Sequence, residues 1–313
     1  MSDSVGVHEA VLLNEAISLM VSNPSGLYVD ATFGRGGHSQ AILDALDQDG
    51  RLIAIDKDLD ALKRAELALT DDPRFEIVHG SFADIEQHLA EKGISVVDGV
   101  LADLGVSSPQ LDNADRGFSF MKDGPLDMRM NQTSGVSASE WLSGASEREI
   151  TAVLRDYGEE KFARRIAAAI SQACQVGPIS TTLELAKIVS DANPSWERHK
   201  HPATRTFQAI RIKVNNELGD LESLLSGACK VLGINGRLVV ISFHSLEDRM
   251  VKRFMRDKVQ GDRPPPNVPV FEKDIVKNYK AIGKAVKPSD KEVSNNIRAR
   301  SAIMRILEKI SNE

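Results

Sequence analysis

The sequence contains few cysteines, few aromatic residues and no long apolar run. Its two cysteines, Cys174 and Cys229, have no paired spacing, which argues against a disulfide framework and against a thiolate metal site. No stretch approaches the ~20 consecutive apolar residues that span a bilayer, so a membrane protein is not expected. The N-terminal segment carries acids where a secretory signal carries Lys or Arg, which predicts a cytoplasmic location.

Histidine pairs with metal-ligand spacing are also lacking. Of the seven histidines, only His199 and His201 lie close together, and no cluster of carboxylates or thiolates accompanies them. A lone histidine is usually structural, so no metal site is expected. His38 differs from the other histidines because it lies on a glycine-rich turn, where a ligand can bind.

An excess of positive charge is missing from the chain as a whole, since the formal net charge is -6. That average argues against a polyanionic partner, but the charge is unevenly distributed. Residues 249–309 hold sixteen Lys or Arg against seven Asp or Glu, a net of +9, so the rest of the chain is near -15. A second basic patch covers Trp196 to Lys213. Solvated surfaces give the same pattern, so the two patches alone leave a polyanionic partner open.

The 313 residues, 42% hydrophobic and 27% charged, fit one large domain or a domain with an insertion. Short apolar runs alternate with helical patterns in the first hundred residues, which predicts a doubly wound α/β sheet. The predicted strands are Leu27–Ala31, Leu52–Asp56, Phe75–His79 and Val96–Asp103. The predicted helices between them are Ser39–Leu46, Leu59–Leu69 and Ala83–Lys92.

After Pro109 this alternation stops, and from about Ser137 to Lys213 the pattern is helical only, which predicts an all-α insertion. The boundaries we infer are 1–133 and 216–313 for the sheet domain and 134–215 for the insertion. The sheet pattern resumes with a helix (Leu218–Leu232), a turn at Asn235-Gly236, a strand (Arg237–Phe243), a proline-rich loop (Gly261–Pro269) and a closing antiparallel pair (Tyr279–Val286 and Ser301–Glu308). Ser301–Glu308 is equally compatible with a helix.

The segment VDATFGRGGHS, Val29 to Ser39, places Gly34, Gly36 and Gly37 between the first strand and its helix. Glycines there let the backbone approach a ligand near the positive end of the helix. The spacing is not the G-x-G-x-x-G of dinucleotide binders, and Asp30 would repel a diphosphate but attract the ammonium group of a methionine. The pattern therefore favours S-adenosylmethionine, and a tight turn without a ligand is the alternative.

Two further positions suit an adenosine. Asp56 ends the second strand twenty residues after Gly36, where a carboxylate accepts hydrogen bonds from ribose hydroxyls. Phe82 follows the third strand, where an aromatic ring can lie against adenine. Taken singly, an acid at a strand end is often a helix cap and a phenylalanine is more often part of the core.

The fourth strand leads into LADLGVSSPQLD, Leu101 to Asp112. Ser107-Ser108-Pro109 stands where amino-methyltransferases carry a short Asp/Asn/Ser-Pro-Pro-aromatic motif, with the second proline and the aromatic replaced. Asp103 and Ser108 are the candidate catalytic residues, because acceptors that engage the N–H bonds of an exocyclic amine help localise its lone pair. Asp103 also suits the methionine end of the cofactor. The base-stacking residue stays unassigned, with Phe118 and Phe120 as candidates.

Together with this loop, three later motifs resemble one known family. They are DRGFSFMKDGPLDMRM from Asp115, HPATRTFQAIRIKVN from His201 and ISFHSLEDR from Ile241. The chain resembles the bacterial 16S rRNA cytosine-N4 methyltransferase family, RsmH, also called MraW, from His8 to the RARSAIMRI segment at Arg298. One departure is Asn296-Ile297-Arg298, where the family commonly shows Asn-Pro-Arg.

The resemblance implies a class I, Rossmann-like methyltransferase sheet with an inserted helical substrate-recognition domain. It implies S-adenosylmethionine as cofactor and, as partner, 16S rRNA in the small ribosomal subunit or a late precursor; a homodimer is compatible with it. The cofactor contacts it implies are Gly36, Gly37, His38, Asp56, Phe82, Asp103 and Gln110. It also favours phosphate contacts from the basic patches, for which the candidates are Arg205, Arg211, Lys213, Arg298 and Arg300.

Three other functions compete with this interpretation. A nicotinamide oxidoreductase is disfavoured by the missing third glycine and by Asp30. A non-catalytic RNA-binding module is disfavoured by the complete glycine turn with Asp56 and Asp103. The third keeps the methyl transfer and changes the acceptor to DNA or to a protein amide.

Overall fold

The computed structural model describes residues 10–195, 201–261 and 276–312. The chain divides into two compact units: a sheet unit, Met1–Gly105 with Gly219–Glu313, and a helical unit, Val106–Leu218. The insertion inferred from the sequence, residues 134–215, lies inside the helical unit, which begins earlier, at Val106.

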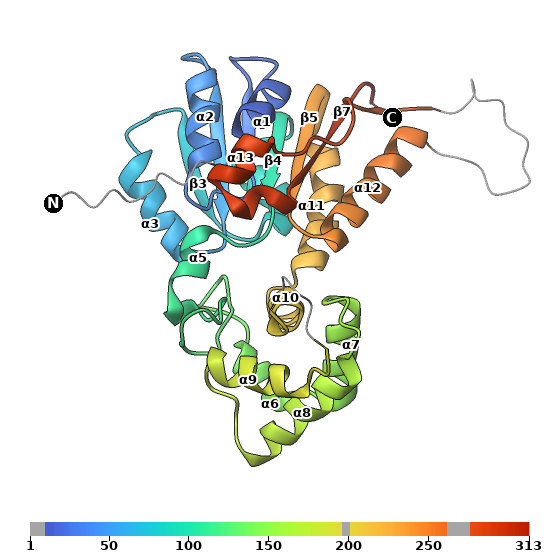
Figure 1. Cartoon of the computed structure of the whole chain (residues 1–313). Coiled ribbons are helices and arrows are strands. Elements are labelled where there is room, and N and C mark those ends of the chain that lie inside the picture. The colour runs from blue at the N-terminus through green and yellow to red at the C-terminus, as the bar shows by residue number, and fades with distance from the viewer. Residues whose placement is uncertain (1–9, 196–200, 262–275, 313) are drawn as a thin grey trace, which may run out of the picture. The chain divides into compact units, whose positions relative to one another are not determined.

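The sheet unit contains one seven-stranded sheet in the order β3-β2-β1-β4-β5-β7-β6 (Figure 1). Strands β1 to β5 are parallel to one another, and β7 is antiparallel to both β5 and β6. The predicted doubly wound α/β class is therefore confirmed. The strands are β1 Leu27–Asp30, β2 Arg51–Asp56, β3 Phe75–His79, β4 Val97–Asp103, β5 Leu232–Ser242, β6 Tyr279–Ala281 and β7 Ile303–Lys309.

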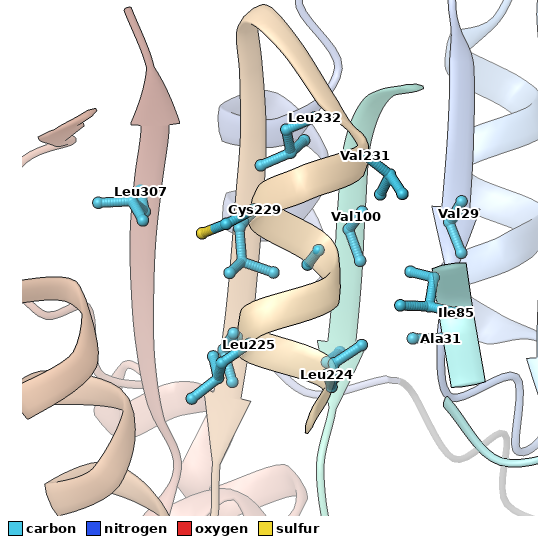
Figure 2. Close-up of a cluster of buried hydrophobic side chains, with 14 of the residues drawn as sticks. Val29, Ala31, Ile85, Val100, Leu224, Leu225, Cys229, Val231, Leu232 and Leu307 are labelled. Carbon is cyan, nitrogen blue, oxygen red and sulfur yellow. The ribbon is translucent and has the colours of Figure 1, made fainter. Parts of the chain in front are cut away.

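Helices cover the sheet and bury both of its faces. Along β2, Ile53 and Ile55 join one buried cluster while Leu52 and Ala54 join another, as the two-residue period of a strand requires. Figure 2 shows the first cluster, where Leu224 of α11 lies among side chains of the strands. The helices are α1 Leu13–Met20, α2 Gly37–Ala45, α3 Leu59–Ala68, η1 Phe82–Asp84, α4 Ile85–Glu91, α11 Glu217–Val231, α12 Ser245–Gln260, α13 Asp290–Asn295 and η4 Ile297–Ser301.

The last three strands differ in detail from the prediction. Asn235 adopts a positive φ of 67° inside β5, so the expected turn is a bulge in a longer strand. The predicted strand Tyr279–Val286 is too long, because β6 ends at Ala281 and beyond it the backbone contacts with β7 are the Ile282 hydrogen bond to Ile306 and an isolated bridge between Val286 and Met304. The closing antiparallel pair is confirmed, with β7 as a strand and not a helix. All of the predicted proline-rich loop beyond Gly261 lies outside the described residues.

The helical unit packs around one apolar cluster that includes Ile150, Leu154, Ile166 and Leu185. Two of its helices begin with a serine that caps the backbone and a glutamate three residues later that reaches back, a strong start signal. The predicted helical character is confirmed. Its elements are α5 Ser108–Asp112, η2 Ala114–Arg116, α6 Ala138–Gly144, α7 Glu147–Asp156, α8 Ala163–Val176, α9 Thr182–Ala192 and α10 Ala203–Val214.

In the described parts of both units, no helix has the length and apolarity that a membrane span needs.

Candidate active site

Three carboxylates end neighbouring parallel strands of the sheet unit. Asp30 ends β1, Asp56 ends β2 and Asp103 ends β4, and β1 lies between the other two strands. The carboxyl ends of parallel strands lie at one edge of a sheet, where open α/β proteins bind their ligands. The three acids predicted from the sequence are thus brought together at that edge.

The glycine turn is attached to this edge by a hydrogen bond. The backbone N–H of Gly34 donates to Oδ2 of Asp56 at 2.7 Å. Gly36 has a φ of +79° and precedes the first residue of α2, and a β-carbon on it would lie 2.7 Å from Cζ of Phe33. Only glycine fits this position without strain, because the φ is left-handed and the space is already filled. The turn therefore brings bare backbone to the end of a helix beside Asp56.

Asp30 faces the protein interior. It is fully buried, and its carboxylate accepts hydrogen bonds from Ser39 Oγ at 2.6 Å and from the Thr32 N–H at 3.1 Å. Burial raises the pKa of Asp30, which these two hydrogen bonds partly offset. The sequence suggested that the charge of Asp30 would attract the ammonium group of a ligand. The structure instead shows an acid that holds the glycine turn in place.

Asp56 is positioned to accept further hydrogen bonds. Its Oδ2 accepts from Gly34, and its Oδ1 accepts from the Asp58 N–H at 2.8 Å. Burial raises the pKa of Asp56 to about 6, and the charges of Asp58 and Asp30 act in the same direction. Each carboxylate oxygen has a second acceptor site, so a pair of ribose hydroxyls could still be bound.

Asp103 has a buried oxygen atom, Oδ1, that makes no hydrogen bond within the described residues. Its backbone N–H donates to Thr32 Oγ1 at 2.7 Å, which fixes the end of β4 against the turn. Burial raises the pKa of Asp103 to about 6, and the nearby His38 lowers it in part. A buried carboxylate oxygen without a donor is costly, so this position favours a ligand that brings a positive charge or an N–H group.

His38 lies beside this carboxylate. Its Nε2 is 3.2 Å from the carbonyl oxygen of Val11, and its Nδ1 is 3.7 Å from Asp103 Oδ2. A carbonyl only accepts, so Nε2 carries a hydrogen, and Nδ1 is the ring atom turned toward Asp103. At 3.7 Å the Nδ1 and Oδ2 atoms are beyond hydrogen-bond distance, so the ring does not supply the donor that the Asp103 carboxylate lacks among the described residues.

Phe82 is held by three residues that the sequence interpretation missed. Lys57 Nζ lies 5.8 Å from the centre of the Phe82 ring and 3.1 Å from Oδ2 of Asp220, in α11. The same oxygen accepts a hydrogen bond at 3.1 Å from Ser81, whose Oγ accepts from the N–H of Ala83 at the start of η1. No local signal reveals this contact, since Asp220 is 163 residues from Lys57 in sequence.

The predicted residues after β4 belong to the helical unit. Ser108 is the half-buried first residue of α5. Gln110 is buried, and its Oε1 accepts the backbone N–H of Ser107 at 2.9 Å, which closes the N-terminus of the helix. Gln110 therefore has a structural role within its own helix, whichever further contact it makes.

The two base-stacking candidates differ in their surroundings. Phe118 is buried in the core of the helical unit, with the guanidinium of Arg116 5.8 Å from its ring. Phe120 is half-buried and stacks on the exposed ring of His201, with centroids 4.5 Å apart, while the edge of Phe207 completes the contact. Of the two, only Phe120 is joined to an exposed aromatic surface.

The five candidate phosphate contacts lie in both units. Arg211 forms two 2.7 Å hydrogen bonds with the buried carboxylate of Glu217. Arg205 donates to the carbonyl oxygen of Glu159 at 2.7 Å, and with His201 it lines a small pocket of the helical unit. Lys213 is exposed on α10, and Arg298 and Arg300 are exposed on η4. Arg211 is thus already neutralised by an ion pair.

Comparisons with known proteins agree on one family. The model of the MraW methylase family matches residues 6–310. The chain is 57% identical to the ribosomal RNA small subunit methyltransferase H of Legionella pneumophila, over 97% of this chain and 99% of that protein. It is 52% identical to the protein of the same name from Marinomonas sp., over the full length of both.

Similarity to solved structures is much weaker. An rRNA methylase from Streptococcus thermophilus aligns with a TM-score of 0.39 and 11% identity, over 95% of this chain and 93% of that one.

Proposed function

The chain belongs to the MraW methylase family, and on that premise we propose that it transfers the methyl group of S-adenosylmethionine to small-subunit ribosomal RNA. The acceptor we propose is the exocyclic N4 amino group of one cytidine in the decoding centre of 16S rRNA. Ribosomal RNA of the small subunit is the substrate in the names of its relatives. The nucleotide, its N4 atom and its place in the subunit are what the resemblance of the motifs described above to the family implies.

The proposed cofactor rests on one observation: the buried Oδ1 of Asp103 has no hydrogen-bond partner among the residues that the structure describes. A buried carboxylate oxygen at this edge calls for a cationic donor, and the ammonium of a methionine moiety is one. A nicotinamide dinucleotide would bring its phosphates to the glycine turn and carries no ammonium group.

The residues of the edge fit the rest of the cofactor. Asp56 would accept the ribose hydroxyls, Phe82 would lie against adenine, and the turn of Gly36 and Gly37 would admit the ligand close to the backbone. His38 and, by the resemblance, Gln110 complete the proposed set. When bound, the cofactor supplies an electrophilic methyl group on a sulfonium.

The residues of the chain would then orient the amino group of the cytosine and exclude water from it. The lone pair of a cytosine amino group is delocalised into the ring, so acceptors that bind its N–H bonds favour attack by the nitrogen. We assign this role to Asp103 and to Ser108, the residue of the Ser-Ser-Pro-Gln segment that opens α5. The methylated nitrogen loses its proton readily because it is positively charged, so a strong base is not required.

Residues 134–215 are proposed as the substrate-recognition region. This region contains Arg205, the exposed Lys213 and the exposed His201, whose ring stacks on Phe120 of the same unit. Aromatic stacking with nearby cations is a usual way to hold an unpaired nucleotide. A ribosomal substrate implies a cytoplasmic enzyme.

Methyl transfer from labelled S-adenosylmethionine into small subunits from a strain that lacks the enzyme tests this function. We expect label in 16S rRNA, recovered after digestion as N4-methylcytidine, and none with the Asp103→Asn variant. Label in DNA or protein with none in the rRNA would refute the proposed substrate.

A further inference from the structure

Helix α12 carries a row of basic side chains along its solvent face. Arg249, Lys252, Arg253 and Arg256 are all exposed, and their spacing of three and four residues puts them on one side of the helix. At about 100° per residue they fall within an arc of roughly 100° and extend over about 10 Å. We call these four residues the α12 ridge.

The opposite face of α12 anchors the helix to the sheet. Val251 and Met255 are buried in the same cluster as residues of β4 and β5. Figure 1 shows α12 next to β5 and β7, with which it is in contact. The ridge therefore projects from a rigidly packed element, so its charges keep a fixed spacing.

The acids of α12 only partly neutralise the ridge. Glu247 is buried, and its Oε2 accepts the backbone N–H groups of Phe243 and His244. Asp248 is held by Arg305 of β7 through hydrogen bonds of 2.8 and 3.1 Å. Only Asp257 is exposed, in a surface ion pair with Arg256. Helix α12 thus exposes four cations and one anion, on a chain whose net charge is -6.

The ridge starts at the edge of the sheet that holds the proposed active site. Strand β5 is parallel to β4, with Ile241 beside Asp103, and α12 begins three residues after β5 ends. Arg249 lies in the second turn of the helix, about 6 Å along the axis from Ser245. From Arg249 the ridge runs away from the carboxyl edge of the sheet. The backbone of an RNA strand would likewise run away from the edge on either side of a target base held there.

The chemistry of the ridge selects among anionic partners. A helix that binds a membrane surface inserts an apolar face, but the apolar face of α12 is buried against the sheet. Stable protein interfaces have an apolar or aromatic core, and α12 exposes no large hydrophobic residue. Phosphate groups need only cations with a regular spacing, which the ridge supplies.

We propose that the α12 ridge binds the phosphate backbone of the small-subunit rRNA next to the target nucleotide. This inference rests on the proposed function for the identity of the RNA. The proposal adds a continuous basic surface, beside the edge that holds the proposed active site, to the five separate phosphate contacts predicted from the sequence.

The test removes two charges of the ridge in the full-length chain and measures binding to isolated small subunits at several salt concentrations. The variant is Lys252→Gln with Arg253→Gln. The matched control is Lys284→Gln with Lys287→Gln, which removes the same charge from two exposed positions of the same basic C-terminal segment. Affinity for S-adenosylhomocysteine confirms that each variant is folded.

We expect the ridge variant to bind about 25-fold more weakly at about 0.1 M salt, since each lost single-strand phosphate contact costs about fivefold there. The slope of log affinity against log salt should become shallower by about 1.4. The control should bind like the unmodified chain. Equal affinity of the two variants for small subunits would overturn the proposal. So would a ridge variant that loses affinity for anionic vesicles but keeps its affinity for small subunits.

Failure of the proposed function gives a different result. In that case the unmodified chain leaves 16S rRNA unmethylated, while the ridge variant still loses affinity for small subunits. Such a result would support the α12 ridge as an RNA-binding surface and would refute the proposed methylation of 16S rRNA.

Discussion

The carboxyl edge of the sheet and the helical unit use their polar side chains in different ways. At the edge, Asp103 keeps a buried oxygen that no donor within residues 10–195, 201–261 and 276–312 reaches, and Asp56 keeps acceptor sites beyond its two backbone contacts. In the helical unit, Arg211 is paired with Glu217 and Gln110 closes its own helix. The edge retains binding capacity for a ligand, whereas these helical residues use theirs to stabilise the fold.

This difference has a physical origin. The backbone hydrogen bonds between parallel strands fix the strand ends, so Asp56 and Asp103 are positioned without using all of their acceptor sites. A helical unit has to satisfy helix ends and buried charges with its own polar residues. Polar groups at the edge are therefore better indicators of function than polar groups in the helices.

The largest effect is expected at Asp103. The variant Asp103→Asn should bind S-adenosylhomocysteine roughly 10- to 100-fold more weakly, because a charge-assisted hydrogen bond contributes about 1.5–3 kcal/mol. Its stability at pH 8 should not fall, because the variant no longer buries a charge. Calorimetry and thermal unfolding measure the two effects.

Asp98→Asn is the matched control, since Asp98 lies near the other end of β4 and accepts the N–H of Leu27. It should leave the affinity unchanged. A similar loss of affinity in both variants would mean that the carboxyl edge has no special role.

The second effect concerns the glycine turn. Gly36→Ala places a methyl group 2.7 Å from Phe33 Cζ in a left-handed backbone, and we expect at least a tenfold loss of affinity for S-adenosylhomocysteine. Gly93→Ala shares the backbone strain, with a φ of +70°, but meets nothing within 4 Å. It should lower the unfolding temperature without changing the affinity, and a loss of affinity there would point to general destabilisation.

The sequence predicted the edge well because strand ends are set by local patterns. Asp56, Phe82 and Asp103 each follow an apolar run, and the parallel topology brings them together. The side-chain contacts that position the residues of the carboxyl edge could not be predicted from the sequence. Asp30 carries no sign that Ser39 and Thr32 turn it inward, and Asp220 reaches Lys57 only in the folded chain.

The helical unit was predictable in type but not in the use of its residues. Capping signals and helical periodicity indicate α6 and α7. Nothing local distinguishes Arg211, which is neutralised by Glu217, from the exposed Lys213 two positions later. The turn between α10 and α11 brings Glu217, six residues later in the chain, to Arg211, and this contact decides which of the two cations is neutralised.

The third effect is a dependence on pH. Burial raises the pKa of Asp56 and of Asp103 to about 6. A raised folded-state pKa means that the native chain binds more protons than the unfolded chain between about pH 4 and 6, so these groups make stability fall as pH rises through that range. Ligand binding needs the ionised forms, so affinity should rise with pH up to about 6.

Below that pH, each group should lower the affinity for S-adenosylhomocysteine by up to about tenfold per pH unit. Titrations in buffers of different ionisation enthalpy count the protons released. In Asp103→Asn one of these proton steps should disappear. An affinity that does not change between pH 5 and 7 would contradict the role of both acids.

The smallest effect is expected in the helical unit. Arg205→Ala should weaken rRNA methylation about fivefold at about 0.1 M salt, as for one lost phosphate contact, and leave the affinity for S-adenosylhomocysteine intact. Steady-state kinetics on small subunits measure the first quantity and calorimetry the second. Equal loss of both would remove the distinction between the two regions.

Calorimetric titration of the unmodified chain with S-adenosylhomocysteine and with NAD tests most directly that the carboxyl edge holds an adenosine and a methionine. We predict one site for S-adenosylhomocysteine and no binding of NAD. Binding of NAD alone would contradict the account.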